Sequence, residues 1–302
     1  MNSPIVTTLP AYVYSNRDAL IAKATLGART RKFITLQTGI KETAQVNLIN
    51  TTVEFRKSTC SFDPTTSQDL SARKITCGHF QVDVQWCDKD LLGKWAEYQV
   101  KIAADKTAED MPFEEYFVQN LIDNINTESD KAFWQGDTTS GEGNLAINDG
   151  ILTLLKADGT VTDASTQATK IAQVNLAVTK IAPAAKAQGV CRLFMSPEYF
   201  EAWLLELVAA NLYHYNPGDG EDEYKIPGTK VIATSVPGLT GANFIVGGNV
   251  ENLFWGADLE SDNEVVDLWY SKDNQAFRGT VQFNLGAQVA FPDQVAYVKI
   301  SA

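Results

Sequence analysis

The chain has 302 residues, of which 44% are hydrophobic and 21% are charged, proportions typical of a globular protein and not of a disordered or membrane-embedded one. A chain of this length can bury a core without disulfide or metal staples. With 25 Lys and Arg against 37 Asp and Glu, its net charge of −12 disfavours tight binding to nucleic acid, because phosphates are repelled.

Residues 1–30 lack the cationic start and apolar run of a secretory leader, and no stretch approaches the roughly 18 apolar residues that span a membrane. The four cysteines are few for this length, which suits a reducing compartment. We therefore expect a cytosolic protein where it is made. The one basic cluster, Arg29, Arg31 and Lys32, is expected to be a solvated surface.

The first part of the chain is predicted to be an arm. Residues 1–50 mix short apolar and polar groups, and no long periodic face appears before Ile34. We expect an extended segment with a brief helix at 17–24. Because such a segment cannot build a core alone, it should lie across this chain's body or a neighbouring copy.

A long hairpin is predicted next, over residues 53–88. Val53 and Phe55 alternate with charged residues, and from Phe80 to Trp86 apolar and polar residues alternate again. The loop between them carries proline and small polar residues, so the tip is expected to be exposed.

The strongest helix signal follows Asp110. Phe113, Phe117, Leu121 and Ile125 recur every four residues, and the run stops at Gly136. The periodicity predicts a helix of roughly 35 Å, at 1.5 Å per residue, long enough to be a strut in an elongated body.

The second half predicts a strand and helix lobe followed by strands, and hence an α+β fold. A helix is expected over 166–187, ended or bent by Pro183. A buried strand over 190–195 leads into Ser196 and Pro197, which are typical of a helix start. That helix is predicted over 199–210. The later strands are predicted at 230–234, 243–246, 264–270, 280–285, 288–291 and 295–300.

Catalytic patterns are weak. Residues 136–141 have the outer glycines of a phosphate-binding loop, but Glu142 replaces the lysine that such a loop needs. The two histidines, His79 and His214, leave a Ser-His-Asp hydrolase little choice of base. We expect no enzyme activity and no cofactor.

Cysteine and acidic clusters leave two metal hypotheses. Cys60, Cys77, His79 and Cys87 could meet around zinc, but they lack the close Cys-x-x-Cys spacing. A cross-strand contact or disulfide between Cys60 and Cys77 is the alternative, and ordinary strand residues are favoured over both. Two acidic groups suggest calcium, yet neither has the glycine of a calcium loop, so solvated loops are favoured; they comprise Asp219, Glu221, Asp222 and Glu223, and Asp258, Glu260, Asp262 and Glu264.

The order of these parts resembles the major capsid proteins of tailed bacteriophages, with the fold named after phage Hong Kong ninety-seven. Three segments carry the resemblance. The first is 226–234, followed by Val236-Pro237-Gly238. The second has Gly247 and Asn249 before Leu253-Phe254-Trp255, and the third is the closing run from Phe277 to Val298. The likeness covers almost the whole chain and depends on the order of elements rather than on any one motif.

The resemblance implies a domain plan. It assigns 1–52 to an N-terminal arm, 53–92 to an extended hairpin loop on an adjacent subunit, and 149–247 to an axial domain. A peripheral domain then comprises 93–148 and 248–302, with a spine helix at 111–135. The residues expected at subunit interfaces are Phe62, Asp63, Pro64, Asp69, Arg73, Lys74, Asp219, Glu221 and Asp222.

The implied function is structural. Copies would form hexamers and pentamers of an icosahedral head, assembled in the bacterial cytoplasm, that encloses double-stranded DNA without binding it specifically. Expected partners are other copies, a portal, and scaffolding, protease or decoration proteins, with no membrane. The nearest alternative is an encapsulin, a bacterial shell of the same fold. A more distant one is a two-lobed ligand-binding protein, which would need an apolar pocket with convergent polar groups.

Overall fold

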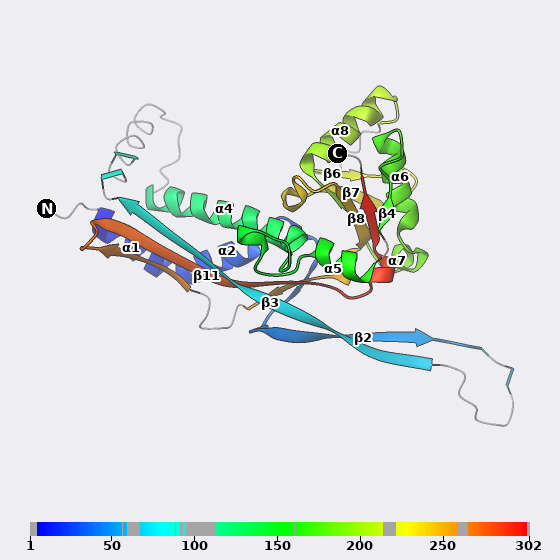
Figure 1. Ribbon diagram of the computed structural model, residues 1–302, viewed down its shortest axis with the longest axis horizontal. Helices are drawn as coiled ribbons and strands as arrows, with labels where there is room; N and C mark the ends of the chain where they lie inside the picture. The colour runs from blue at the N-terminus through cyan, green and yellow to red at the C-terminus, as the bar shows by residue number, and fades with distance from the viewer. Residues whose placement is uncertain are drawn as a thin grey trace.

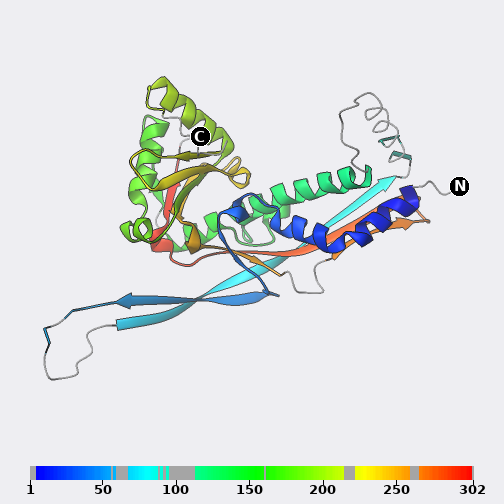
Figure 2. The same cartoon turned by 180° about the vertical axis from the view of Figure 1, so that it is seen from behind.

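The computed structural model describes residues 5–55, 57–58, 67–87, 89–90, 93–94, 113–159, 161–213, 222–258 and 265–300. They form an elongated body, a compact lobe at one end of it, and a long hairpin that projects away from both (Figure 1 and Figure 2). The predicted α+β class is confirmed. Among the described helices, none combines the length and apolar character needed to span a bilayer.

One sheet of six strands forms the body. Its order is β1-β9-β11-β3-β2, with β10 paired to β11 beside that path. The strands are β1 (Thr35–Gln37), β2 (Thr43–Thr52), β3 (Ser67–Cys87), β9 (Leu253–Ala257), β10 (Val265–Ser271) and β11 (Ala276–Val289). Because β3 is much longer than its neighbours, one half lies in the body and the other half in the hairpin.

Three helices cover one face of this sheet: α1 (Ile5–Ser15), α2 (Arg17–Leu26) and α4 (Phe113–Gln135) (Figure 1). α4 occupies the region where the sequence period predicts a long helix. Phe133, Trp134 and Trp255 lie at the centre of the core between the helices and the sheet, and all three are fully buried. The Phe133 and Trp255 rings stack with their centroids 4.6 Å apart.

The N-terminal segment differs from the prediction. The helix expected at 17–24 is present as α2, but the segment before it is not extended, because residues 5–15 form the helix α1. Leu9, Val13, Leu20 and Ala24 are buried in the core of their own chain. These apolar residues show no long helical periodicity in the sequence, yet they are buried, because the body of the same chain supplies the apolar surface against which they pack.

The lobe has its own sheet and core. Its six strands run in the order β4-β12-β8-β5-β7-β6, and Leu193, Trp203 and Ile245 are among its buried residues. The strands are β4 (Thr162–Asp163), β5 (Cys191–Met195), β6 (Glu223–Lys225), β7 (Val231–Ser235), β8 (Phe244–Asn249) and β12 (Ala296–Lys299). β12 pairs with β8, although it falls in the segment 248–302 that the resemblance assigns to the other domain.

The lobe helices follow local signals closely. Pro183 ends the predicted 166–187 helix, which divides into α6 (Lys170–Lys180) and α7 (Pro183–Gln188). The helix predicted over 199–210 is confirmed as α8 (Pro197–Ala209), and the Ser196 side chain accepts a hydrogen bond from the Tyr199 N–H. That bond satisfies one of the free donors at the helix start. A short helix, α5 (Ile151–Asp158), joins α4 to the lobe.

Two strand predictions are corrected. No strand forms at 53–55, because β2 ends at Thr52, and residues 76–87 pair with β11 instead of with the residues after Thr52. The predicted strand 280–285 and the first two residues of the predicted strand 288–291 belong to one strand, β11, which continues through Gly286 and ends at Val289. A Cβ at Gly286 would lie 2.8 Å from the Cys77 Sγ, so the glycine permits close strand contact and does not break the strand.

Candidate assembly surfaces

The projecting hairpin carries apolar side chains that its own chain does not cover. In the ladder between β2 and β3, Ile49 lies opposite Leu70, and these side chains are 59% and 76% exposed. Val46 and Leu48 point to the other face of the hairpin and are buried. The two faces therefore differ: one packs at the base of the hairpin and the other leaves a cross-strand apolar pair exposed.

The chain remains apolar and exposed just after β2. Val53 is 58% exposed and Phe55 is 98% exposed. Apolar residues scattered singly on a surface are ordinary, but these two follow the exposed Ile49 closely along the chain. The far end of the hairpin is thus suited to burial against another surface.

The base of the hairpin is anchored to the body. Arg73 forms an ion pair with Asp158 at the end of α5, and the Gln288 Nε2 donates a hydrogen bond to the Lys74 carbonyl oxygen over 2.6 Å. Burial lowers the pKa of Arg73, while the charge of Asp293 opposes this change. A small core of Ile40, Val46, Leu48, Ile75, Cys77 and Ala290 fixes the same region. The base of the hairpin is therefore fixed to the body.

The lobe presents a second exposed apolar surface. Leu205 and Val208 lie three residues apart near the end of α8, and both are exposed, as is Leu212, which follows the end of the helix at Ala209. The spacing of Leu205 and Val208 places these two on one side of the helix. The Tyr213 ring stacks on Tyr224 beside them, with centroids 5.4 Å apart.

A buried polar joint connects the arm, α4 and the lobe. The Asp130 carboxylate accepts hydrogen bonds from the Thr30 N–H at 3.2 Å and from the Gly238 N–H at 2.9 Å. Burial raises the pKa of Asp130, and the hydrogen bonds from Thr30 and Gly238 and the charge of Arg29 oppose that rise. One carboxylate therefore satisfies donors from two distant segments.

Aromatic and amide groups complete the joint. The Trp134 Nε1 donates to the Thr30 Oγ1 over 2.8 Å, and the Gln135 Nε2 donates to the Gly238 carbonyl oxygen over 2.7 Å. Nearby, Arg192 lies 4.2 Å over the Phe33 ring and pairs with Glu223 at 3.0 Å. The lobe is thus fixed to the body within one chain.

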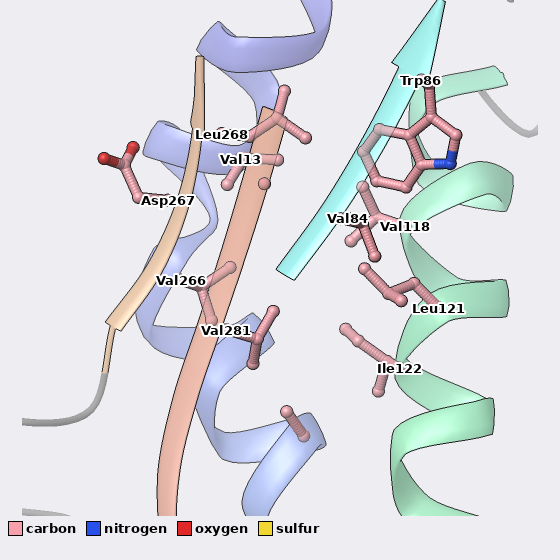
Figure 3. A pocket seen from close by; sticks show the side chains of 12 residues that line it. Val13, Val84, Trp86, Val118, Leu121, Ile122, Val266, Asp267, Leu268 and Val281 are labelled. Atoms are coloured by element: carbon pink, nitrogen blue, oxygen red, sulfur yellow. The ribbon is translucent and has the colours of Figure 1, made fainter. Parts of the chain in front are cut away.

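The hollow interior of the body is too small for a ligand. Figure 3 shows it between α4, the N-terminal helices and the sheet, lined by residues such as Val84, Val118, Leu121 and Val281, with Asp267 pointing away. Its volume is about 20 Å³, close to the space of one water molecule. The interior lacks the convergent polar groups that a ligand site requires.

Cys77, His79 and Cys87 all lie on β3, with Cys87 ten residues beyond Cys77. The Cys77 thiol is buried in the small core at the hairpin base, and Cys87 is exposed at the other end of the strand. The His79 Nδ1 is 2.6 Å from the Asn284 Oδ1. Across the described part of the chain, no group of three or more His, Cys, Asp or Glu side chains is placed to hold a metal ion. Cys60, and with it the proposed pairing with Cys77, lies outside the described residues.

Comparison with solved structures identifies the fold. The procapsid of satellite phage P4, which includes a size-determination protein, matches with a TM-score of 0.65 and 12% identity over 100% of this chain and 98% of that chain. The capsid of a native GTA particle matches at 0.58 and 14% identity, over 93% and 91% of the two chains. The chain has the phage capsid fold.

The same fold includes protein shells that enclose other contents. The SrpI encapsulin of Synechococcus elongatus PCC 7942 matches with a TM-score of 0.55 and 10% identity, over 89% of this chain and 86% of that chain. No family model matches the sequence, and no curated protein matches it. The likeness to shell proteins therefore lies in the course of the chain and not in its residues.

With the phage capsid fold established, the predicted interface residues can be placed. Phe62, Asp63, Pro64, Asp219 and Glu221 lie outside the described residues, and for Asp69 only the backbone in β3 is described. Arg73 and Lys74 lie at the hairpin base, where Lys74 is exposed and Arg73 is partly buried by its ion pair with Asp158. Their role between subunits remains a prediction.

Asp222 has a partner in its own chain. It pairs with Arg29 over 2.6 Å, and both side chains are partly exposed. Arg29 is therefore not simply a solvated cation, because it links the arm to the lobe. The exposed pair Ile49 and Leu70 is not among the interface residues expected from the sequence, although the alternation of Val46 and Leu48 with polar residues indicates a strand in that segment.

Proposed function

We propose that this chain is the major capsid protein of a tailed bacteriophage. Copies would assemble into hexamers and pentamers of an icosahedral head that encloses the double-stranded DNA genome. The observation that carries this proposal is the phage capsid fold over the full chain together with a projecting hairpin whose apolar residues have no cover in one copy.

Shell formation needs contacts that repeat from copy to copy. The hairpin end and the α1 end lie at opposite extremes of the molecule (Figure 1), so a contact between them is head-to-tail, and such contacts generate rings when the rotation closes. Many modest contacts per copy then add up to a stable particle.

The proposal keeps the domain plan of arm, hairpin, peripheral and axial parts. It also keeps the interface residues at the hairpin and the acidic loop. The hairpin ladder begins at Thr43, which places the base of the projection within the segment 1–52 assigned to the arm. The exposed pair Ile49 and Leu70 joins the proposed interface.

The charge of the chain suits a container. A net charge of −12 gives the wall little affinity for phosphates, so the genome would be enclosed without specific binding. A portal, and scaffolding, protease or decoration proteins, are proposed partners, and assembly is proposed in the host cytoplasm. The chain would act without catalysis or cofactor.

An encapsulin is the second candidate, favoured by the match to the SrpI encapsulin. The phage assignment is preferred because the P4 procapsid matches with a higher TM-score over both full chains. The contents of particles separate the two: nuclease-protected DNA from an infected host supports the phage head, and an enclosed enzyme supports the encapsulin.

The test of shell formation is direct. Purified full-length protein should elute at megadalton size in size-exclusion chromatography and show closed particles by negative-stain electron microscopy. A stable monomer under all conditions, including coexpression with the other head proteins of the same phage, would contradict the proposal.

A further inference from the structure

One face of the body sheet lies open across β3, β10 and β11. The helices α1, α2 and α4 cover the other face (Figure 1). Because successive side chains of a strand point to opposite sides, every second residue faces away from those helices. Figure 3 shows the alternation on β10, where Val266 and Leu268 border the hollow interior and Asp267 points away from it. The side chains on the side of Asp267 face solvent.

The strand register arranges these side chains in two rows. The rows are Trp269, Arg278 and Gln85, and Asp267, Thr280 and Asp83. We call these six side chains the open sheet face. Since neighbouring strands lie about 4.8 Å apart and alternate residues of a strand about 7 Å apart, the six cover an area of roughly 10 Å by 7 Å.

Hydrogen bonds between the strands orient the polar groups of the open sheet face. The Asp83 carboxylate accepts a hydrogen bond from the Thr280 hydroxyl at 2.8 Å and one from the Gln81 Nε2 at 2.7 Å. The Arg278 Nε donates to the Gln85 Oε1 over 3.3 Å. Amide, carboxylate and guanidinium groups have several donors or acceptors each, so these bonds hold the groups in place and leave them able to bind a ligand.

An indole ring borders the polar groups. Trp269 is 41% exposed, whereas Trp134 and Trp255 are fully buried in the core. Trp269 lines a hollow of about 390 Å³ together with Gln85 and Arg278, within the range of roughly 300–1,000 Å³ that small-molecule sites occupy. The negative face of an aromatic ring attracts the weakly positive hydrogens of a C–H group. The hollow therefore combines a surface for C–H groups with oriented polar groups.

This combination suits a neutral sugar. A phosphate-bearing ligand would meet Asp83, Asp267 and a net charge of −12. A protein partner would bury apolar area, but Trp269 is the one large apolar side chain among the six of the open sheet face. A pyranose ring presents a face of C–H groups surrounded by hydroxyls that donate and accept hydrogen bonds, so the indole matches its face and the polar side chains match its edge.

We propose that the open sheet face binds a pyranose ring of a neutral polysaccharide, with the ring stacked on Trp269 and its hydroxyls bound by Asp83 and Arg278. This inference goes beyond the proposed function and does not depend on it. On a particle, many identical shallow sites would act together, so weak binding at each site would add up to firm attachment to a polysaccharide surface.

The test is calorimetric titration of the full-length protein with cellohexaose, a neutral chain of glucose rings whose faces carry C–H groups. The parent chain should bind it at millimolar concentration, and Trp269→Ala should weaken binding about tenfold. Trp269→Phe keeps a ring and should retain most of the affinity. Arg278→Ala should weaken binding about fivefold, because a hydrogen bond from a charged group is lost.

The matched control variant is Tyr14→Ala, which removes an aromatic ring that is 83% exposed on α1 and should bind cellohexaose like the parent. The control ligand is sorbitol, which has the hydroxyls of a sugar but no ring face and should not bind. Circular dichroism shows whether each variant is folded, and Trp269→Phe and Arg278→Ala decide the test if Trp269→Ala does not fold.

Three results would overturn the inference. The first is a parent chain that binds no cellohexaose, and the second is equal binding by the parent, Trp269→Ala and Arg278→Ala. The third is binding by the unassembled chain that disappears in particles, because the open sheet face would then serve contacts between copies. Shell formation is judged by electron microscopy alone, so failure of this inference and failure of the proposed function are distinguishable.

Discussion

The joint around Asp130 and the far half of the hairpin differ in whether their side chains are buried within one copy. At the joint, polar groups from three distant segments satisfy one another inside a single chain, and Trp134 is fully buried. On the hairpin, Ile49, Leu70 and Phe55 remain exposed although each could bury apolar surface. Since burial of such groups is favourable, the joint stabilises one copy, and we propose that the hairpin buries its apolar groups against another.

The largest expected effect lies at the joint. Trp134→Ala should lower the free energy of unfolding by about 3–5 kcal/mol, because a buried indole and its hydrogen bond to Thr30 are lost. Chemical denaturation of the unassembled chain measures this. Trp269→Ala removes a partly exposed indole on β10 and should cost far less. An equal loss of unfolding free energy in both variants would show that the joint does not contribute more to stability than an exposed site does.

A smaller change at the joint tests its close packing. A Cβ at Gly238 would lie 2.4 Å from the Asp130 carbonyl oxygen and 2.5 Å from the Trp134 Cδ1. Gly238→Ala should therefore cost about 1–3 kcal/mol of stability through overpacking.

Gly248→Ala is the control for that substitution, since its Cβ would lie 3.3 Å from a Val295 methyl group. Thermal unfolding of the two variants compares them. A Gly238→Ala chain as stable as the parent would mean that the lobe moves freely relative to α4.

Substitutions on the hairpin should affect assembly and leave the stability of the single chain almost unchanged. Ile49→Asp with Leu70→Lys places opposite charges across the ladder and should change the unfolding free energy by only about 0.5 kcal/mol, yet it should abolish particles in electron micrographs. Asn47→Asp adds a charge to the same strand without removing an apolar side chain, and it should leave assembly intact. Normal particles from the double variant would place the assembly contacts elsewhere.

The two thiols of β3 distinguish its buried middle from its exposed end without any change in stability. Burial raises the pKa of Cys77 to about 12, so at pH 8 it remains protonated and unreactive, because only the thiolate is the nucleophile. The exposed Cys87 should react with a thiol reagent under the same conditions. Mass spectrometry after brief labelling checks this. Fast labelling of Cys77 would show that the hairpin base opens in solution.

Local signals in the sequence predicted the elements that depend on neighbours along the chain. Ser196 and Pro197 begin α8 as expected, Pro183 separates α6 from α7, and the four-residue period marks α4. These features follow from hydrogen bonds and steric limits within a few residues, so the sequence alone was sufficient. The order of such elements also led to the phage capsid fold.

Only the tertiary structure decided how distant segments pair. The partners of β3 change from β2 to β11 near Thr76, Gly286 continues a strand because Cys77 leaves no room for a side chain, and Asp222 meets Arg29. None of these contacts has a local signal, because each depends on a surface supplied by residues far away in the chain. The exposed pair Ile49 and Leu70 became visible for the same reason: a strand's two faces can be told apart only when one of them is covered.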